Sequence, residues 1–119
     1  MMDDRPGAAT LARYEQAYRR GDAAGCAACF HADATLHSAF GPPAQGRAAI
    51  EALHRDWVQD GAGKTLEIVE HGAEGGLAWA WVRFAEGAET GVGWSLAVMV
   101  RDGAGGWLIR AVSLTAGEE

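Results

Sequence analysis

Two tyrosines, Tyr14 and Tyr18, are the first side chains whose type and spacing could do chemistry. They are four residues apart, so a helix places them one turn apart on the same face. Phenol groups aimed into a pocket could hold a carbonyl group or stabilise an enolate. The alternative is that both are core tyrosines, each with a hydroxyl that satisfies one hydrogen bond at the rim of the core.

One histidine, His54, lies in an apolar helical stripe beside Leu53, Trp57 and Val58. Burial there disfavours the charged imidazolium, and a neutral imidazole can act as a general base or as a hydrogen-bond acceptor. The alternative is a core histidine tied to a backbone or hydroxyl partner. If the protein is an enzyme, we expect proton transfer, with His54 as acid or base and Tyr14 as donor to the developing oxyanion.

Two cysteines, Cys26 and Cys29, have the C-x-x-C spacing of redox and metal sites. The redox motif follows a strand and opens a helix, whereas this pair lies within a short helix. A structural zinc needs four ligands, and His31 raises the local set only to three. We therefore expect two small buried helical residues, and the sequence predicts no metal and no cofactor.

Helical periodicity in the first half of the chain must position these groups. Apolar residues at spacings of three and four predict a helix over 8–20 that carries both tyrosines. A glycine stop and an aspartate cap predict a second, short helix over 22–30. The third helix, over 46–60, has the clearest apolar stripe and carries His54.

Strands separated by breakers and turns account for the rest of the chain. A short strand over 34–40 is expected to end at Gly41-Pro42-Pro43. Four further strands are expected, over 64–71, 77–86, 91–101 and 107–115. Helices followed by a meander of strands indicate a single α+β domain, residues 1–119, with an antiparallel sheet.

The last three strands are apolar on both faces. In the strand over 77–86, Trp79 and Trp81 share one face. The opposite face carries Ala78, Ala80, Val82 and Phe84. An antiparallel sheet with one face in water should alternate apolar and polar residues, and a domain this short has no further layer to cover the second apolar face. We therefore expect a homodimer packed through the outer face of the sheet.

The alternation of side chains does not decide which residues of the final strand, over 107–115, face inward. In one phase the inward residues are Trp107, Ile109 and Ala111. In the other they are Leu108, Arg110 and Val112. A slip of one residue exchanges the two faces, so both phases remain possible at this stage.

Charge and composition exclude several classes of partner. The 119 residues have a formal net charge of −6 at pH 7, and Lys64 is the single lysine. Binding to a phosphate backbone needs clustered Lys and Arg, so no nucleic acid partner is expected. No apolar run approaches the roughly 18–20 residues of a membrane helix, and the polar N-terminal sequence lacks the apolar stretch of a secretion signal. We expect a cytoplasmic protein with no membrane partner.

Several motifs resemble a known superfamily. They are Leu11-Ala12-Arg13-Tyr14, Gly21-Asp22-Ala23, Phe30-His31-Ala32-Asp33-Ala34-Thr35 and Gly46-Arg47-Ala48-Ala49-Ile50. With them the chain resembles the nuclear transport factor 2-like superfamily over nearly its whole length, closest to the SnoaL-like and ketosteroid isomerase-like branch. The resemblance implies a cystatin-like fold, a cone-shaped roll of three N-terminal helices packed on a curved antiparallel or mixed sheet around an interior pocket. This fold hosts isomerases, cyclases, hydrolases, transport factors and association domains, so the motifs specify the fold rather than the function.

The isomerase roles carry over only in part. The resemblance matches the family's oxyanion-donating tyrosine to Tyr14, its general-base aspartate to Ser38 and its second oxyanion donor to a position at or near Ala97. A serine hydroxyl cannot hold a proton reversibly near neutral pH. Another tyrosine of that site lines up with His54. Since both carboxylates are missing, steroid isomerisation is not expected.

The sequence thus predicts a pocket for an apolar, ring-sized ligand that carries a carbonyl or hydroxyl group. Inward-facing alanines leave room for this ligand, since their side chains are too small to fill the interior. Protein cores are normally packed without voids, so such room indicates a binding site. Beside Tyr14 and His54, the expected ligand-binding residues are Tyr18, Phe30, Ser38, Phe40, Trp57, Val82, Phe84, Ala97 and Met99. The alternative is a non-catalytic homodimeric module that binds a metabolite or joins proteins.

Overall fold

The computed structural model describes residues 5–39, 41–87 and 91–116, without the side chain of residue 116. The helices are α1 (Ala8–Arg19), α2 (Ala23–Ala27), α3 (Arg47–Trp57) and the 3-10 helix η1 (Val58–Gly63). The strands are β1 (Phe30–Ser38), β2 (Gly41–Gln45), β3 (Thr65–Glu74), β4 (Leu77–Ala85), β5 (Gly93–Arg101) and β6 (Trp107–Ala116). Within the described ranges, no helix is long and apolar enough to span a bilayer.

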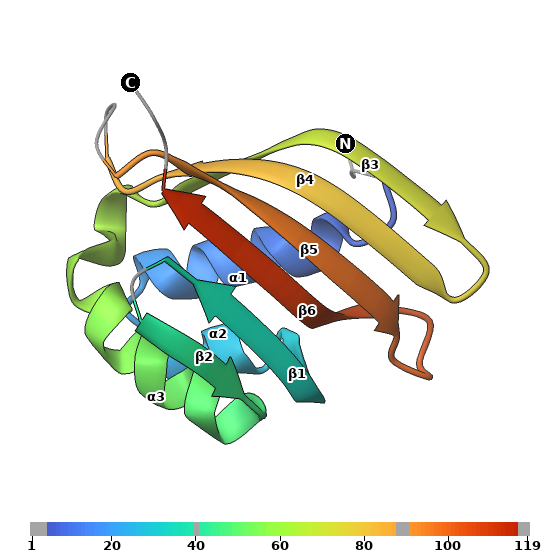
Figure 1. The fold of residues 1–119 in the computed structure, drawn as a ribbon, viewed down its shortest axis with the longest axis horizontal. Helices are drawn as coiled ribbons and strands as arrows, with labels where there is room; N and C mark the ends of the chain where they lie inside the picture. Colours follow the sequence, from blue (N-terminus) through green and yellow to red (C-terminus); the bar gives the residue numbers. More distant parts are fainter. Residues whose placement is uncertain (1–4, 40, 88–90, 117–119) are drawn as a thin grey trace.

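The six strands form one mixed sheet in the order β2-β1-β6-β5-β4-β3. β1 runs parallel to β6, and the other neighbouring pairs are antiparallel. Figure 1 shows the helices gathered behind one face of this twisted sheet, with the other face left uncovered. The predicted α+β architecture, helices packed on a curved mixed sheet, is therefore confirmed.

The faces of β4 also agree with the prediction. The buried inner face consists of Ala78, Ala80, Val82 and Phe84. On the outer face, Trp79 is 38% exposed, and Leu96 of the neighbouring β5 is 39% exposed. The inner face packs on the helices, and the outer face is the apolar surface that the sequence predicts.

Several boundaries differ from the expected ones by a few residues, and two of the differences, at β2 and at the start of β1, change the elements themselves. The Gly41-Pro42-Pro43 sequence lies inside β2, an edge strand that pairs with β1, and the register of this pair shifts opposite the two prolines, between Leu36 and Ser38, as expected where prolines interrupt a ladder. Phe30, expected in the second helix, begins β1 instead. The α2 helix ends at Ala27, and the backbone N–H of Ile109 donates to the Cys29 carbonyl oxygen at 2.9 Å, which draws the chain into the sheet beside β6.

The final strand combines both of the predicted phases. Its register with β5 shifts where Met99 pairs with Ile109, and Arg110 is left as the extra residue of a β-bulge. Ile109 before the bulge and Val112 after it are both buried, whereas Arg110 is exposed. A bulge changes the phase inside one strand, so no single alternation could describe it.

Candidate functional site

Two adjoining spaces lie on the helix side of the sheet. The inner cavity has a volume of about 30 Å³, which is room for roughly one or two water molecules. Predicted ligand-binding residues in its wall are Tyr14, Phe30, Val82, Phe84 and Ala97. Leucine, isoleucine and valine side chains from α1 and the strands, together with Lys64 and Ser95, complete the wall. The interior is therefore more completely filled than the many alanines suggest.

The outer cleft is larger, at about 250 Å³, and opens to solvent. It is lined by Tyr18, Trp57, Lys64, Phe84, Glu86 and Leu114. Lys64, Phe84 and Leu114 also line the inner cavity, so the two spaces adjoin at these side chains. Three aromatic rings and one ion pair give the cleft apolar walls with a single polar corner, which is typical of small-molecule sites.

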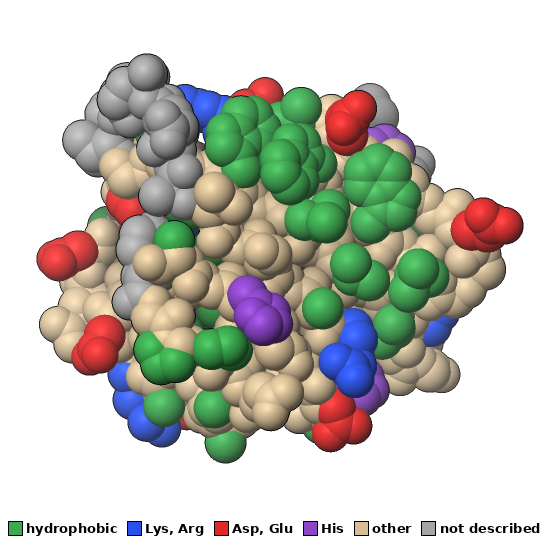
Figure 2. All heavy atoms as spheres, in the orientation of Figure 1, with side chains coloured by type: hydrophobic (Ala, Val, Ile, Leu, Met, Phe, Trp, Pro, Cys, Tyr) green, Lys and Arg blue, Asp and Glu red, His purple; other side chains and the backbone are tan. Residues whose placement is uncertain are grey.

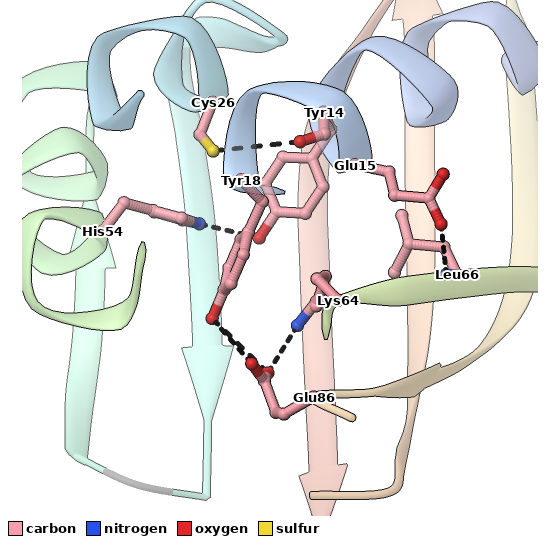
Figure 3. A network of polar contacts seen from close by, with 8 residues as sticks. All are labelled: Tyr14, Glu15, Tyr18, Cys26, His54, Lys64, Leu66 and Glu86. Carbon is pink, nitrogen blue, oxygen red and sulfur yellow. Dashed lines mark hydrogen bonds and ion pairs between the residues drawn. The ribbon is translucent and has the colours of Figure 1, made fainter. Parts of the chain in front are cut away.

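Tyr14 and His54 bind one another, as Figure 3 shows. The Tyr14 hydroxyl lies 2.7 Å from Nε2 of His54, and Nδ1 lies 2.8 Å from the carbonyl oxygen of Ile50. A carbonyl oxygen can only accept, so we assign the imidazole proton to Nδ1, and Nε2 accepts from the Tyr14 hydroxyl. The two residues come from the inward stripes of α1 and α3, and both are buried.

Burial sets the charge of this pair. Desolvation lowers the pKa of His54 to about 4 and raises the pKa of Tyr14 well above its ordinary value. Both side chains are therefore neutral near pH 7. The imidazole lone pair and the phenol proton are engaged in the bond that joins them, so Tyr14 can donate to a ligand, and Nε2 of His54 can accept from one, only after that bond opens.

Lys64 lies where the cleft meets the cavity. Its Nζ is 2.8 Å from Oε2 of Glu86, and it stands 4.3 Å from the centre of the Tyr18 ring and 4.7 Å from that of Phe84. The Tyr18 hydroxyl donates to both carboxylate oxygens of Glu86 at 3.4 Å. Figure 3 shows the amine and the phenol converging on this one carboxylate.

The two ends of the ion pair differ in exposure. The Lys64 side chain is 4% exposed, whereas that of Glu86 is 34% exposed. Burial lowers the pKa of Lys64, and the contact with Glu86 opposes that shift. Burial and the same carboxylate raise the pKa of Tyr18. A buried ammonium without a counter-ion is costly, so Lys64 depends on the carboxylate beside it.

Two glycines allow the backbone to close around the cleft. A Cβ at Gly61 would lie 2.6 Å from the carbonyl oxygen of Tyr18, so the absence of a side chain lets η1 pack against α1. A Cβ at Gly93 would lie 2.4 Å from Cζ of Phe84. Gly93 pairs with Phe84 across β5 and β4, so the phenyl ring lies over the glycine and forms the wall of both spaces.

The structure brings only some of the predicted ligand-binding residues to these spaces. Tyr18 and Trp57 line the cleft. Among the predicted site residues that the structure describes, three line neither space: His54, Ser38 and Met99. His54 packs behind Tyr14, Ser38 lies at the end of β1, and Met99 packs against the backbone at the start of α1. Phe40 lies outside the described residues.

Lys64 and Glu86 are the polar residues of the cleft that the sequence prediction omitted. Strand alternation could have identified both. Lys64 is in phase with Leu66, which lines the inner cavity, and Glu86 is in phase with Val82 and Phe84 on the inner face of β4. A charged residue in phase with a buried apolar face is directed toward the interior.

Cys26 and Cys29 are free, buried thiols. Burial raises the pKa of Cys26 to about 12, so its reactive thiolate is scarce near neutral pH. In the part of the chain that the structure describes, no three His, Cys, Asp or Glu side chains are grouped so that they could hold a metal ion.

The fold and the site together define a class of protein: a small α+β roll in which helices and a curved sheet enclose an apolar interior behind an aromatic cleft. The SnoaL-like domain family matches residues 11–104, and the chain belongs to that family. No curated protein matches the chain in sequence.

Solved structures share this fold at low sequence identity. A ketosteroid isomerase-like protein from Erwinia carotovora atroseptica is 17% identical, with a TM-score of 0.75 and 93% of each chain covered. A domain of unknown function with a cystatin-like fold from Nostoc punctiforme is 24% identical, with a TM-score of 0.77 over 93% of this chain and 75% of that one. An NTF2-like protein with a cystatin-like fold from Novosphingobium aromaticivorans is 22% identical, with a TM-score of 0.70 over 91% and 77%. These similarities confirm the predicted fold, and the family match over residues 11–104 confirms the predicted SnoaL-like membership.

Proposed function

We propose that the protein binds a small apolar molecule with one ring in the outer cleft. The observation that carries the proposal is the cleft itself, about 250 Å³ in volume and walled by the rings of Tyr18, Trp57 and Phe84. Ligand pockets usually measure about 300–1,000 Å³, and this cleft of about 250 Å³ lies just below that range, so it suits a ligand with a single ring. Membership of the SnoaL-like family supports a ligand-binding or isomerase-like role.

Proton transfer by Tyr14 and His54 stays a prediction, and the geometry favours binding over it. An oxyanion needs a donor, yet the Tyr14 hydroxyl already donates to Nε2 of His54. A general base needs a free lone pair, yet that of His54 accepts from Tyr14, and burial makes the imidazole a weak base. The hydrogen-bonded pair of Tyr14 and His54 is therefore a buried structural unit at the inner cavity, next to the cleft.

The test is a thermal-shift screen of small ring compounds on the native chain and on Leu114→Trp. Leu114 lines both spaces, so the larger indole fills their junction. A ligand at about 100 times its dissociation constant stabilises the native chain by about 2.7 kcal/mol, which raises Tm by roughly 10 °C. We expect Leu114→Trp to lose that rise.

The matched control is Leu77→Trp, because Leu77 is 50% exposed on the sheet and lines neither space. We expect this variant to keep the full rise in Tm. A rise that survives in Leu114→Trp would place the ligand elsewhere, and a screen without any selective rise would remove the proposal.

A second candidate is a non-catalytic homodimeric module that associates through the outer face of the sheet. An apolar surface favours it, since Trp81 and Trp94 stack with ring centres 5.8 Å apart, and Trp79 and Leu96 are exposed beside them. Figure 2 shows hydrophobic side chains gathered on this face. Exposed apolar patches with aromatic residues mark interaction sites. The cleft lies on the helix side of the sheet, so both functions are compatible.

A further inference from the structure

The ion pair in the cleft indicates which chemical class of ligand fits it. We propose that Lys64 and Tyr18 form a carboxylate-binding pair, that Glu86 occupies this pair in the unliganded protein, and that a ring-bearing carboxylate displaces Glu86. This inference rests on the proposed function, because it names the charged group of a ligand in the same cleft.

Two donors from different elements already hold one carboxylate. Lys64, between η1 and β3, reaches Oε2 of Glu86 at 2.8 Å, and the Tyr18 hydroxyl of α1 reaches both carboxylate oxygens at 3.4 Å. A carboxylate accepts hydrogen bonds at both oxygens, and bonds from an ammonium are among the strongest in proteins. The arrangement is therefore a formed carboxylate site with a carboxylate in it (Figure 3).

The difference in exposure indicates which partner can leave. The Lys64 ammonium is held between the Tyr18 and Phe84 rings and is almost completely buried. Glu86 has a third of its side chain in solvent and can turn outward at little cost in hydration. Because a buried ammonium must keep a counter-ion, Glu86 leaves only when another anion takes its place.

The cleft accommodates the rest of such a ligand. Its remaining walls, Trp57, Phe84 and Leu114, are apolar and stand beside the ion pair. A ligand carboxylate on Lys64 and Tyr18 therefore places an attached ring against these side chains. A ring-bearing amine should bind more weakly, because it would bring a second cation beside Lys64. A ring-bearing alcohol should also bind more weakly, because it is neutral and forms no charge-assisted bond with the Lys64 ammonium like that of a carboxylate.

The experiment compares benzoate, benzyl alcohol and benzylamine, which share a ring and differ in charge. Binding is followed by NMR titration of the Trp57 indole in the native chain, Glu86→Gln, Lys64→Met and Glu51→Gln. We expect benzoate to bind the native chain more tightly than the other two compounds. Glu86→Gln removes the competing carboxylate, so benzoate affinity should rise about tenfold, equivalent to about 1.4 kcal/mol.

Glu51→Gln is the matched control, because Glu51 forms an exposed i,i+4 ion pair with Arg55 on α3 and lines neither space. It changes the net charge as Glu86→Gln does and should leave benzoate affinity unchanged. Lys64→Met should abolish the preference for benzoate over benzyl alcohol. If Lys64→Met does not fold, the benzoate affinities of Glu86→Gln and Glu51→Gln are sufficient to test whether Glu86 competes with the ligand.

Two results would overturn the inference and leave the proposed function standing. One is benzyl alcohol binding as tightly as benzoate, and the other is equal benzoate affinity in the native chain and in Glu86→Gln. If none of the three compounds shifts the Trp57 indole, the inference fails together with ring binding in this cleft.

Discussion

A single buried imidazole makes the stability of this protein depend on pH. His54 has a pKa of about 4 in the folded protein against an ordinary value of 6.5, because burial penalises its charge. Between pH 6.5 and 4 the unfolded chain binds a proton at His54 that the folded chain does not, so the free energy of unfolding falls as the pH falls. The expected loss by pH 4 is about 3 kcal/mol, with no contribution above pH 6.5. Urea unfolding at a series of pH values measures it.

The variant His54→Gln provides the control, because glutamine does not titrate. Its free energy of unfolding should change less than that of the native chain between pH 6.5 and 4. Asp22 and Asp102 also have lowered pKa values, chiefly because backbone N–H groups donate to them. The ordinary pKa of both carboxyl groups is 3.8. The stability that their lowered pKa values contribute is therefore lost below about pH 4, outside the range of pH 6.5 to 4 that His54 controls. An unchanged slope in His54→Gln would contradict the assignment to His54.

At the scale of elements, the contact between β4, β5 and β6 depends on a missing side chain at Gly93. A Cβ there would lie 2.4 Å from Cζ of Phe84 and 2.5 Å from the Thr115 carbonyl oxygen, and the backbone oxygen cannot easily move. Gly93→Ala should therefore lower the free energy of unfolding by about 1–3 kcal/mol, as overpacked cores do. Gly41→Ala is the control, since nothing lies within 4 Å of its Cβ. Equal urea midpoints for the two variants would refute the argument.

The elements that could be predicted from the sequence are those whose signal is local. The stripes of α1 and α3 and the faces of β4 repeat within a few residues, so Tyr14 and His54 could be placed on inward faces. The proline-containing edge strand β2 and the bulge at Arg110 depend on partner strands, and local alternation does not report them. Likewise, the bond between Tyr14 and His54 joins residues 40 positions apart. The sequence indicated a neutral histidine but could not show what it binds.

The same limit applies to the cleft. Tyr18, Trp57 and Phe84 could be predicted as ligand-binding residues of an interior pocket, because each lies on an inward apolar face, and the structure places them around the outer cleft. The ion pair of Lys64 and Glu86 forms only when the start of β3 and the end of β4 come together, and these residues are 22 positions apart. The polar corner, and with it the charge of a suitable ligand, therefore follows from the tertiary structure.

At the scale of the whole molecule, the outer face of the sheet is expected to bury itself against a second copy of the chain. Among the described residues, this face exposes the large hydrophobic side chains of Leu77, Trp79 and Leu96, and the stacked pair of Trp81 and Trp94 lies beside them. Leu96→Glu places a carboxylate on this face and should weaken association at least about tenfold, because an unpaired charge would be buried at the interface. Sedimentation equilibrium should give twice the 12.5 kDa chain mass for the native protein and the single-chain mass for the variant at the same concentration.

The control for this prediction is Ala52→Glu, which adds the same charge to an exposed position of α3, away from the outer face of the sheet. It should sediment like the native protein. Two results would contradict the predicted dimer. One is a native chain with a mass of 12.5 kDa at tens of micromolar, and the other is a Leu96→Glu variant that keeps twice that mass. The outer face of the sheet would then be left for another partner. Because the cleft lies on the opposite side of the sheet, either result leaves ligand binding to be judged by its own experiment.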